Sequence, residues 1–330
     1  MVMRAAVCPG YGPPEVVRIA EVEKPTPADD QVLVRVHATT VNRTDCGVRC
    51  GKPAFARLFY GLTRPKATIL GNEFAGEVEA VGGDVTSYRP GDRVFGFTAG
   101  FGAPGEFGAH AEYLVMPAAG PLACMPANMT YEEVAPGTEG AHYAGALIET
   151  ARIGSGHHVL VYGATGAIGS AAVQLLKGIG ADVTAVCATN GLELVRSLGA
   201  DRVVDYTAQD FTKDDQRYDF VIDAVGKTTF GRCRQLLKPG GSFLVTDGGP
   251  LFQNLFLVFL TPLLGSRRVR FGLQRQSHAT VAHLKELLES GQFRPVVDRR
   301  YSLDEIVEAY RYVDTGRKMG NVVITVRPSA

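Results

Sequence analysis

Residues 159–177 read VLVYGATGAIGSAAVQLLK, a β-branched run followed by a glycine turn and a long amphipathic segment. In such a strand–turn–helix unit, Gly163 permits the sharp exit from the strand, Gly166 lets backbone N–H groups reach a pyrophosphate, and Gly169 lets helix and strand pack closely. The stretch therefore predicts a dinucleotide site. The residues predicted to contact the dinucleotide are Gly163, Ala164, Thr165, Gly166, Ala167, Ile168 and Gly169.

This glycine pattern departs from the strict G-x-G-x-x-G spacing, because Ala164 and Thr165 occupy the interval where a glycine often lies. The surrounding sequence supports the dinucleotide interpretation, since strand-like runs alternate with helical ones after the motif. These strand-like runs cover residues 181–187, 202–205, 218–223 and 241–246. Strands and helices that alternate at this spacing predict an α/β fold with a doubly wound parallel sheet. The alternative is a glycine-rich turn that binds no ligand.

The end of the second predicted strand bears on the choice between NAD and NADP. NAD sites commonly place an Asp or Glu there to hold the ribose hydroxyls, whereas residues 188–191 read ATNG. Thr189 and Asn190 could donate hydrogen bonds to a 2′-phosphate, and Lys177 could neutralise its charge. The sequence therefore predicts NADPH as the cofactor. For Lys177, a solvated position on its helix is the alternative.

Length and charge restrict the function class. The chain has 330 residues, more than the roughly 250–300 at which single cores stop growing, so two domains are expected. Lys and Arg number 34, as do Asp and Glu, which argues against nucleic acid as a partner. The six cysteines form no C-x-x-C pair, and the start MVMRAAV has no apolar signal segment, so a cytoplasmic location is expected.

One apolar run, residues 251–264, needs a separate interpretation. Gln253, Asn254 and Pro262 interrupt it, and it is shorter than the roughly 18–20 residues of a membrane span. We expect a buried or lid-like segment that covers the nicotinamide pocket or meets a partner subunit. Gly248 precedes it and would let the chain turn over the cofactor.

The sequence before residue 125 has a different character. Short alternating runs are separated by glycine and proline turns, which predicts an antiparallel, barrel-like domain. The runs cover residues 16–22, 31–40, 73–81, 93–97 and 111–116. Near the other end of the chain, residues 302–305 form a capping box before a helix that stops at Gly316, and residues 321–326 read as a strand.

The order of these elements and the motifs inside them resemble the medium-chain dehydrogenase/reductases, in the zinc-free branch of quinone oxidoreductases, zeta-crystallin and enone reductases. The motifs are VNRTD at 41–45, GNEFAGEV at 71–78, GDRV at 91–94, LKPGG at 237–241 and GNVV at 320–323. The resemblance implies a GroES-like β-barrel-type catalytic domain from residues 1–125 and 295–330. A Rossmann domain, residues 126–294, would lie between these two segments.

The resemblance also bears on metal. Zinc-dependent relatives carry a cysteine at the position of Asn42 and a histidine at that of Asn72, and neither asparagine is a competent Zn²⁺ ligand. Residues 98–113, where a structural zinc would lie, contain no cysteine, and no histidine or second cysteine pair completes a site with Cys46 and Cys50. We therefore predict no metal.

Without a Lewis acid, alcohol oxidation lacks its main electrophile, whereas reduction of a quinone or an α,β-unsaturated carbonyl needs only hydride, hydrogen-bond donors and a proton. The predicted function is an NADPH-dependent quinone or enone reductase. One rival is an enoyl-thioester reductase, with Arg57, Arg64 and Lys66 at the mouth of its cleft. Another is a non-enzymatic NADPH-binding structural or partner protein, which would bind the cofactor without turnover.

Several site residues follow from the resemblance. Asn42 should lie beside the nicotinamide ribose or the substrate oxygen. Quinone oxidoreductases commonly have a tyrosine where this chain has Gly47, so His142 and Tyr60 are the candidate catalytic replacements. Their alternatives are a packed helix histidine and an ordinary loop aromatic. The further cofactor contacts implied are Tyr206 at the adenosine phosphate, Val225, Gly248 and, with Gly320, Asn321.

A homodimer is also expected. Residues 267–273 read RRVRFGL and alternate like an edge strand, and the corresponding strand in the family tends to pair across a two-fold axis. Pairing there would also explain the apolar run before it. The alternative is a monomer in which the arginines protect an exposed edge.

Overall fold

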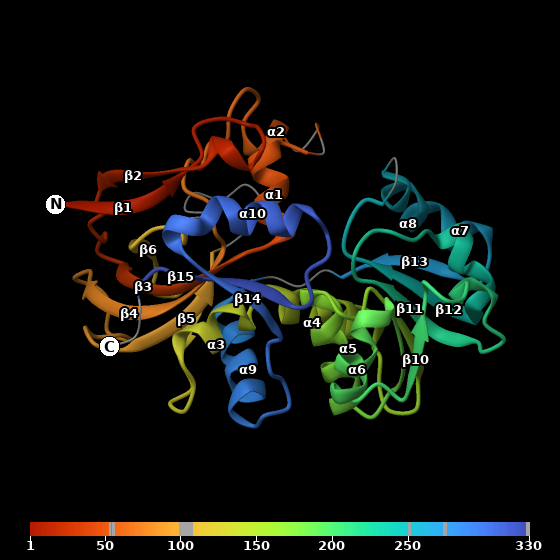
Figure 1. Cartoon of the computed structure of the whole chain (residues 1–330). Helices are drawn as coiled ribbons and strands as arrows, with labels where there is room; N and C mark the ends of the chain where they lie inside the picture. The colour runs from red at the N-terminus through yellow and green to blue at the C-terminus, as the bar shows by residue number, and fades with distance from the viewer. Residues whose placement is uncertain (53, 55–56, 99–107, 250–251, 273–275, 328–330) are drawn as a thin grey trace. The chain divides into compact units, whose positions relative to one another are not determined.

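The computed structural model describes residues 1–52, 54, 57–98, 108–249, 252–272 and 276–327. The chain forms two compact units (Figure 1). Unit 1 comprises Met1–Glu139, Gln276–Glu289 and Pro295–Ala330, and unit 2 comprises Gly140–Arg275 and Ser290–Arg294.

Unit 2 contains the predicted doubly wound sheet. Six strands lie in the order β10-β9-β8-β11-β12-β13, and every neighbouring pair is parallel. The strands are β8 (His158–Tyr162), β9 (Asp182–Cys187), β10 (Arg202–Asp205), β11 (Tyr218–Asp223), β12 (Leu237–Val245) and β13 (Arg268–Phe271). The order reverses between β8 and β11, which is where ligands bind in folds of this kind.

The helices of unit 2 follow from the same alternation. Their bounds are α4 (Glu139–Ala151), α5 (Ala167–Gly178), α6 (Leu192–Ser197), α7 (Phe230–Cys233) and α8 (Gln253–Leu264). Helices α5 and α6 lie on one side of the sheet and α7 and α8 on the other (Figure 1). The sheet is covered on both faces, so its central strands bury consecutive apolar residues, as Val159, Leu160 and Val161 of β8 illustrate with no exposed surface.

Unit 1 is built around an antiparallel sheet, as predicted for the GroES-like domain. Its order is β14-β15-β3-β4-β5-β7, with β6 also on β3, and only β14–β15 is parallel. These strands are β3 (Gln31–Val41), β4 (Glu73–Val81), β5 (Arg93–Phe97), β6 (Tyr113–Pro117), β7 (Leu122–Cys124), β14 (Val297–Ser302) and β15 (Asn321–Thr325). A hairpin of β1 (Val2–Val7) and β2 (Arg18–Glu23) forms a separate two-stranded sheet.

The helices of unit 1 come from distant parts of the chain. They are α1 (Arg43–Cys50), α2 (Arg57–Tyr60), α3 (Tyr131–Val134), α9 (His278–Glu289) and α10 (Ile306–Asp314). The predicted capping box is present, since the side chains of Ser302 and Glu305 bond each other's backbone N–H groups before α10. In the part of the chain that the structure describes, no helix is long and apolar enough to cross a membrane.

The boundaries between the units differ from the predicted ones at two segments. Residues 126–139 and α9 were expected in the Rossmann domain, but both belong to unit 1. Helix α9 packs on β7, where the ring Nδ1 of His278 lies 2.7 Å from the carbonyl oxygen of Leu122. Sequence periodicity shows that α9 is a helix but not which sheet it covers.

Candidate functional site

The glycine turn of unit 2 has the backbone shape that a pyrophosphate site needs. Gly163 has φ +78°, and a Cβ there would lie 2.6 Å from the side chain of Val225. A Cβ on Gly169 would lie 2.2 Å from the carbonyl oxygen of Gly163, so only glycine lets helix and strand approach this closely. Gly166 caps α5 without a side chain, which leaves the first N–H groups of the helix available to an anion. These residues fit an NAD(P)H pyrophosphate.

Four other predicted cofactor residues of unit 2 lie at the same edge of the sheet. Thr189, Tyr206, Val225 and Gly248 each follow the end of a parallel strand, as the glycine turn does. The carboxyl ends of parallel strands meet at one edge, so the structure brings these five segments together there. A Cβ on Gly191 would lie 2.3 Å from the Thr165 side chain, so the turn after β9 contacts the glycine turn directly.

A cleft of about 350 Å³ at this edge includes Tyr206. Its aromatic walls are the exposed ring of Tyr206 and the stacked pair of Tyr162 and Phe211, whose centroids are 4.9 Å apart. The lining residues are Tyr162, Tyr206, Thr207, Ala208, Gln209, Asp210, Phe211 and Arg232. Such a cleft can hold a flat aromatic group such as adenine.

Sequence reasoning missed an acid beside the turn after β9. Asp205 ends β10, directly opposite Cys187 of β9 in the parallel register. Its carboxylate accepts hydrogen bonds from the hydroxyls of Thr189, at 2.6 Å, and Thr207, at 2.6 Å. The Thr189 and Thr207 hydroxyls lower the pKa of Asp205, which is therefore charged at neutral pH. Asp205 is part of the predicted strand 202–205, but only the pairing of β10 with β9 shows that it lies beside the turn after β9.

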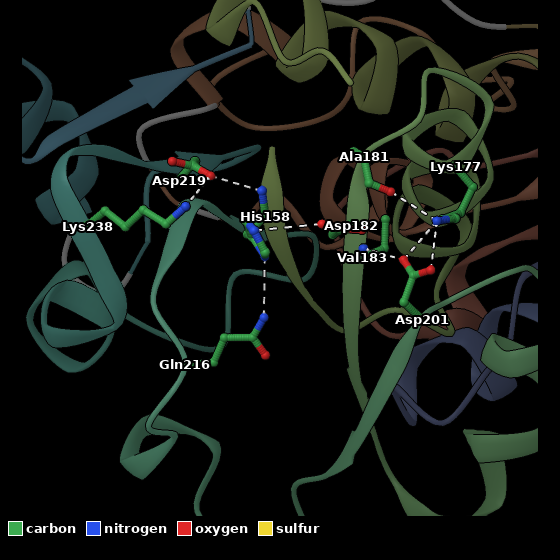
Figure 2. Close-up of polar contacts among 9 residues, drawn as sticks. All are labelled: His158, Lys177, Ala181, Asp182, Val183, Asp201, Gln216, Asp219 and Lys238. Atoms are coloured by element: carbon green, nitrogen blue, oxygen red, sulfur yellow. Dashed lines mark hydrogen bonds and ion pairs between the residues drawn. The ribbon is translucent and has the colours of Figure 1, made fainter. Parts of the chain in front are cut away.

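The structure corrects the expectation for Lys177. Its ammonium donates to both carboxylate oxygens of Asp201 at 2.8 Å and to the carbonyl oxygen of Ala181 at 3.0 Å (Figure 2). These contacts lie at the start of β9, whereas Thr189 follows its end, roughly 17–20 Å along a six-residue strand. Lys177 is therefore remote from the expected 2′-phosphate and anchors the end of α5 to the sheet.

Unit 1 contains a buried polar network around Glu73. One oxygen of its carboxylate accepts from the Asn42 side chain at 2.6 Å and the Thr40 hydroxyl at 2.7 Å. The other accepts from the Thr138 hydroxyl at 2.9 Å, the Thr138 N–H at 3.2 Å and the Glu139 N–H at 2.5 Å. Burial raises the pKa of Glu73, but these five donors stabilise its charged form.

A second buried acid, Glu139, has different surroundings. Its carboxylate accepts hydrogen bonds from the Thr44 hydroxyl and the Asn72 side chain. Burial and the nearby charge of Glu73 raise the pKa of Glu139 to about 7. Lys318 partly offsets this effect, and burial lowers the pKa of Lys318 itself. Neither acid is among the residues predicted for the site, although Glu73 lies inside the motif GNEFAGEV.

Buried acceptor atoms near this network have no partner among the described residues. They are the Oδ1 atoms of Asn42, Asn72 and Asn321. A buried amide oxygen without a donor costs stability, so each is suited to accept from a bound molecule, such as a ribose hydroxyl or a carboxamide. This observation supports the expectation that Asn42 and Asn321 bind a ligand.

The two candidate catalytic residues lie in different units. Tyr60 belongs to the hydrophobic core of unit 1, together with Cys46, Leu70 and Tyr310. His142 is buried in α4 of unit 2, and burial lowers its pKa to about 4. His142 is therefore neutral near pH 7, so it can donate a hydrogen bond but cannot serve as a cationic acid. Catalytic roles for both residues remain predictions.

The donor set at Asn42 and Asn72 does not fit zinc. The Asn42 amide donates to Glu73, and neutral amides lack the thiolate or imidazole character that Zn²⁺ prefers. Among the described residues, no group of three or more His, Cys, Asp or Glu side chains could hold a metal ion. Residues 99–107 of the lobe expected to lack zinc lie outside the described residues.

Comparisons with known proteins identify the family of this chain. Residues 28–127 match the family described as "Alcohol dehydrogenase GroES-like domain", and residues 198–324 match "Zinc-binding dehydrogenase". The chain is 32% identical over 329 residues to a 2-methylene-furan-3-one reductase of Solanum lycopersicum, covering 98% of this chain and 79% of that protein. It is 30% identical to an NADPH-dependent alkenal/one oxidoreductase of Arabidopsis thaliana, with the same coverage.

A solved structure is similar over the whole chain. The quinone oxidoreductase of Coxiella burnetii superposes with a TM-score of 0.88 and 25% identity, covering 99% of this chain and 100% of that one. The fold, the glycine turn and these relatives agree on a two-domain dehydrogenase architecture.

The Glu73 network generates a stability prediction. In Glu73→Gln, one carboxylate oxygen becomes an NH₂ group that faces other donors, so we expect the free energy of unfolding to fall by about 2–4 kcal/mol. The matched control is Glu77→Gln, on the same strand but partly exposed, with an expected change within about 0.5 kcal/mol. Urea denaturation measures both, and equal midpoints for the two variants would contradict the role of Glu73.

Proposed function

The chain belongs to the medium-chain dehydrogenase/reductase superfamily, and we propose that it reduces quinones or α,β-unsaturated carbonyl compounds with NADPH and without a metal ion. The observation that carries the proposal is the amide pair of Asn42 and Asn72 beside Glu73, at positions where a zinc enzyme would present metal ligands. Relatives named as quinone, alkenal and furanone reductases support the acceptor class.

The proposed reduction is compatible with amide side chains at the positions of Asn42 and Asn72. When bound, NADPH supplies a hydride, which adds to a conjugated carbon or to a quinone. The charge that develops on the acceptor oxygen then needs hydrogen-bond donors and a proton rather than a strong Lewis acid. His142, as a neutral donor, is the proposed hydrogen-bonding residue for this charge. Asn42 would bind the nicotinamide ribose, because its amide nitrogen donates to Glu73 and its free oxygen can only accept. Tyr60 would shape the pocket from the core of unit 1.

The proposed cofactor contacts are as follows. The glycine turn would hold the pyrophosphate, Tyr206 the adenosine, and Val225 and Gly248 the nicotinamide half. Asn321 would accept a hydrogen bond from the cofactor through its unpaired oxygen. Thr189 and Asn190, both exposed after β9, would hold the 2′-phosphate, with no acid in the turn that contains them.

We propose a cytoplasmic location, because all six cysteines are free thiols, as a reducing compartment favours. The thioester-reductase alternative expects three basic residues at the mouth of the cleft, and one of them, Arg57, is engaged by other groups of the protein. Arg57 stacks on the Tyr11 ring at 4.6 Å and donates to the carbonyl oxygen of Gly51. Arg64 and Lys66 are exposed and remain available to a phosphorylated carrier.

The first test is oxidation of NADPH, followed by its absorbance, with a benzoquinone, an aromatic ortho-quinone, a 2-alkenal and crotonyl-CoA. We expect turnover of the quinones or the alkenal that is unaffected by EDTA, because no metal takes part. Crotonyl-CoA as the best acceptor would favour the thioester rival. Tight NADPH binding without turnover of any acceptor would support the non-enzymatic alternative.

The second test concerns Asp205. If the 2′-phosphate lies beside Thr189, the Asp205 carboxylate repels it, so Asp205→Asn should lower the KM for NADPH about three- to tenfold. The KM for NADH should not fall, because NADH carries no 2′-phosphate. The control is Asp201→Asn, which lies at the opposite edge of the sheet. An unchanged NADPH-to-NADH preference in Asp205→Asn would contradict the placement of the phosphate.

We also propose a homodimer through β13 and α8. Strand β13 pairs only with β12 among the described residues, so one of its edges is open; residue 273 of the predicted strand lies outside them. Helix α8 packs on β13 and exposes a row of large apolar side chains. These are Leu255, Phe256, Phe259, Leu260, Leu263 and Leu264. A second copy that pairs along β13 would cover part of this row.

The dimer generates its own prediction. The double variant Phe259→Asp/Leu263→Asp should shift the chain from dimer to monomer, because two carboxylates would be buried at the interface. Leu58→Asp, at an exposed leucine of unit 1, serves as the control and should leave the mass unchanged. Sedimentation equilibrium measures the mass. A monomeric wild type, or a dimeric double variant, would contradict the proposed interface.

A further inference from the structure

Two buried carboxylates, Glu73 and Glu139, share one site but have unequal surroundings. The Glu139 N–H donates to Glu73 at 2.5 Å, so the two residues are in direct contact. Glu73 accepts from five donors, whereas the side chain of Glu139 has a hydroxyl and an amide as its hydrogen-bond partners. Two neighbouring buried charges repel strongly. Glu73, which accepts more hydrogen bonds, therefore keeps its charge, and Glu139 keeps a proton.

The groups that face Glu139 come from three segments of unit 1. Helix α1 contributes Thr44 and the buried Asp45, and β4 with its preceding residue contributes Glu73 and Asn72. The segment before β15 contributes Lys318. The acids favour a protonated Glu139, and the Lys318 ammonium favours its ionised form. This balance places the pKa of Glu139 at about 7, where a group can both give and regain a proton near neutral pH.

Thr44 connects this acid to the surface of unit 1. Glu139 is only 7% exposed, whereas Thr44 is partly exposed and lies two residues after Asn42, in the first turn of α1. A hydroxyl both accepts and donates hydrogen bonds. The Thr44 oxygen can therefore take a proton from Glu139 as its own proton leaves toward a molecule bound beside Asn42.

We propose that Glu139 stores the proton that completes the reduction and that the Thr44 hydroxyl delivers it to the acceptor. The inference rests on the proposed function. Hydride addition leaves a negative charge on the acceptor oxygen as an enolate or a hydroquinone anion. The Thr44 O–H bond breaks as the acceptor O–H bond forms, and the Glu139 carboxyl replaces the proton on Thr44. NADPH is oxidised, the acceptor is reduced, and the Glu139 carboxylate regains a proton from water.

The test compares kcat with saturating NADPH between about pH 5 and 9 for the wild type, Glu139→Gln, Thr44→Ser and Thr44→Val. The wild-type kcat should fall as pH rises through about 7, because only protonated Glu139 is competent. Glu139→Gln and Thr44→Val should lower kcat about 100-fold or more, flatten the profile and leave NADPH affinity unchanged. Thr44→Ser should retain most activity. Glu308→Gln, a surface acid of α10, should behave like the wild type.

A second measurement detects the proton without turnover. Difference infrared spectroscopy of the protein alone should show a protonated carboxyl band that disappears above about pH 7 in the wild type and is absent in Glu139→Gln. Should Glu139→Gln fail to fold, Thr44→Val and the infrared titration of the wild type still decide the question.

The two proposals fail in different ways. A wild type that turns over no acceptor overturns the proposed reductase function and this inference with it. A wild type that turns over acceptor, while Glu139→Gln retains its kcat and its pH profile, overturns this inference alone. A rate loss in Glu139→Gln with an unflattened profile indicates a structural role and also overturns it.

Discussion

Burial of the Glu73 carboxylate is the constraint on which the candidate site of unit 1 depends. A buried carboxylate costs several kcal/mol unless hydrogen bonds satisfy it, so every one of its donors must be in place in the folded chain. Those donors lie 31 to 66 residues away in the sequence, on β3, before α1 and at the start of α4. One carboxylate therefore joins three segments, and it fixes the Asn42 side chain with its amide nitrogen inward and its oxygen unpaired.

The same constraint separates the roles of the two acids. Because the donors gather on Glu73, little stabilisation remains for a second negative charge beside it. Glu139 consequently has a pKa raised to about 7 by burial and by Glu73. The neutral amides of Asn42 and Asn72 add polar contacts without adding charge, and five donors already occupy the Glu73 carboxylate, so the two amides replace the thiolate and imidazole ligands that Zn²⁺ prefers. An arrangement of this kind suits proton transfer to a transient anion better than alcohol oxidation.

Much of the fold was predictable from periodicity and turn chemistry. The runs at 202–205 and 218–223 coincide with β10 and β11, and the glycine turn lies where the motif placed it. The failures arose where function depends on pairing between elements. Nothing in the sequence shows at which end of β9 the Lys177 ammonium is bound, or that Asp205 lies opposite Cys187. Glu139 has no motif of its own, because its properties come from Glu73, which is far away in sequence.

The two edges of the parallel sheet in unit 2 have different roles: the amino edge stabilises the fold, and the carboxyl edge carries the candidate binding groups. At the amino edge, Lys177–Asp201 and Lys238–Asp219 ion pairs at 2.8 Å anchor helix and strand ends (Figure 2). The carboxyl edge instead carries the bare glycine turn and the exposed Tyr206 ring, groups that gain most from a bound ligand.

Asp205 is the exception at that edge. The Thr189 hydroxyl is bonded to this carboxylate, so a 2′-phosphate at the proposed position would compete with Asp205 for its donor. Under that proposal, discrimination between NADPH and NADH would depend on a neighbouring strand as well as on the turn after β9.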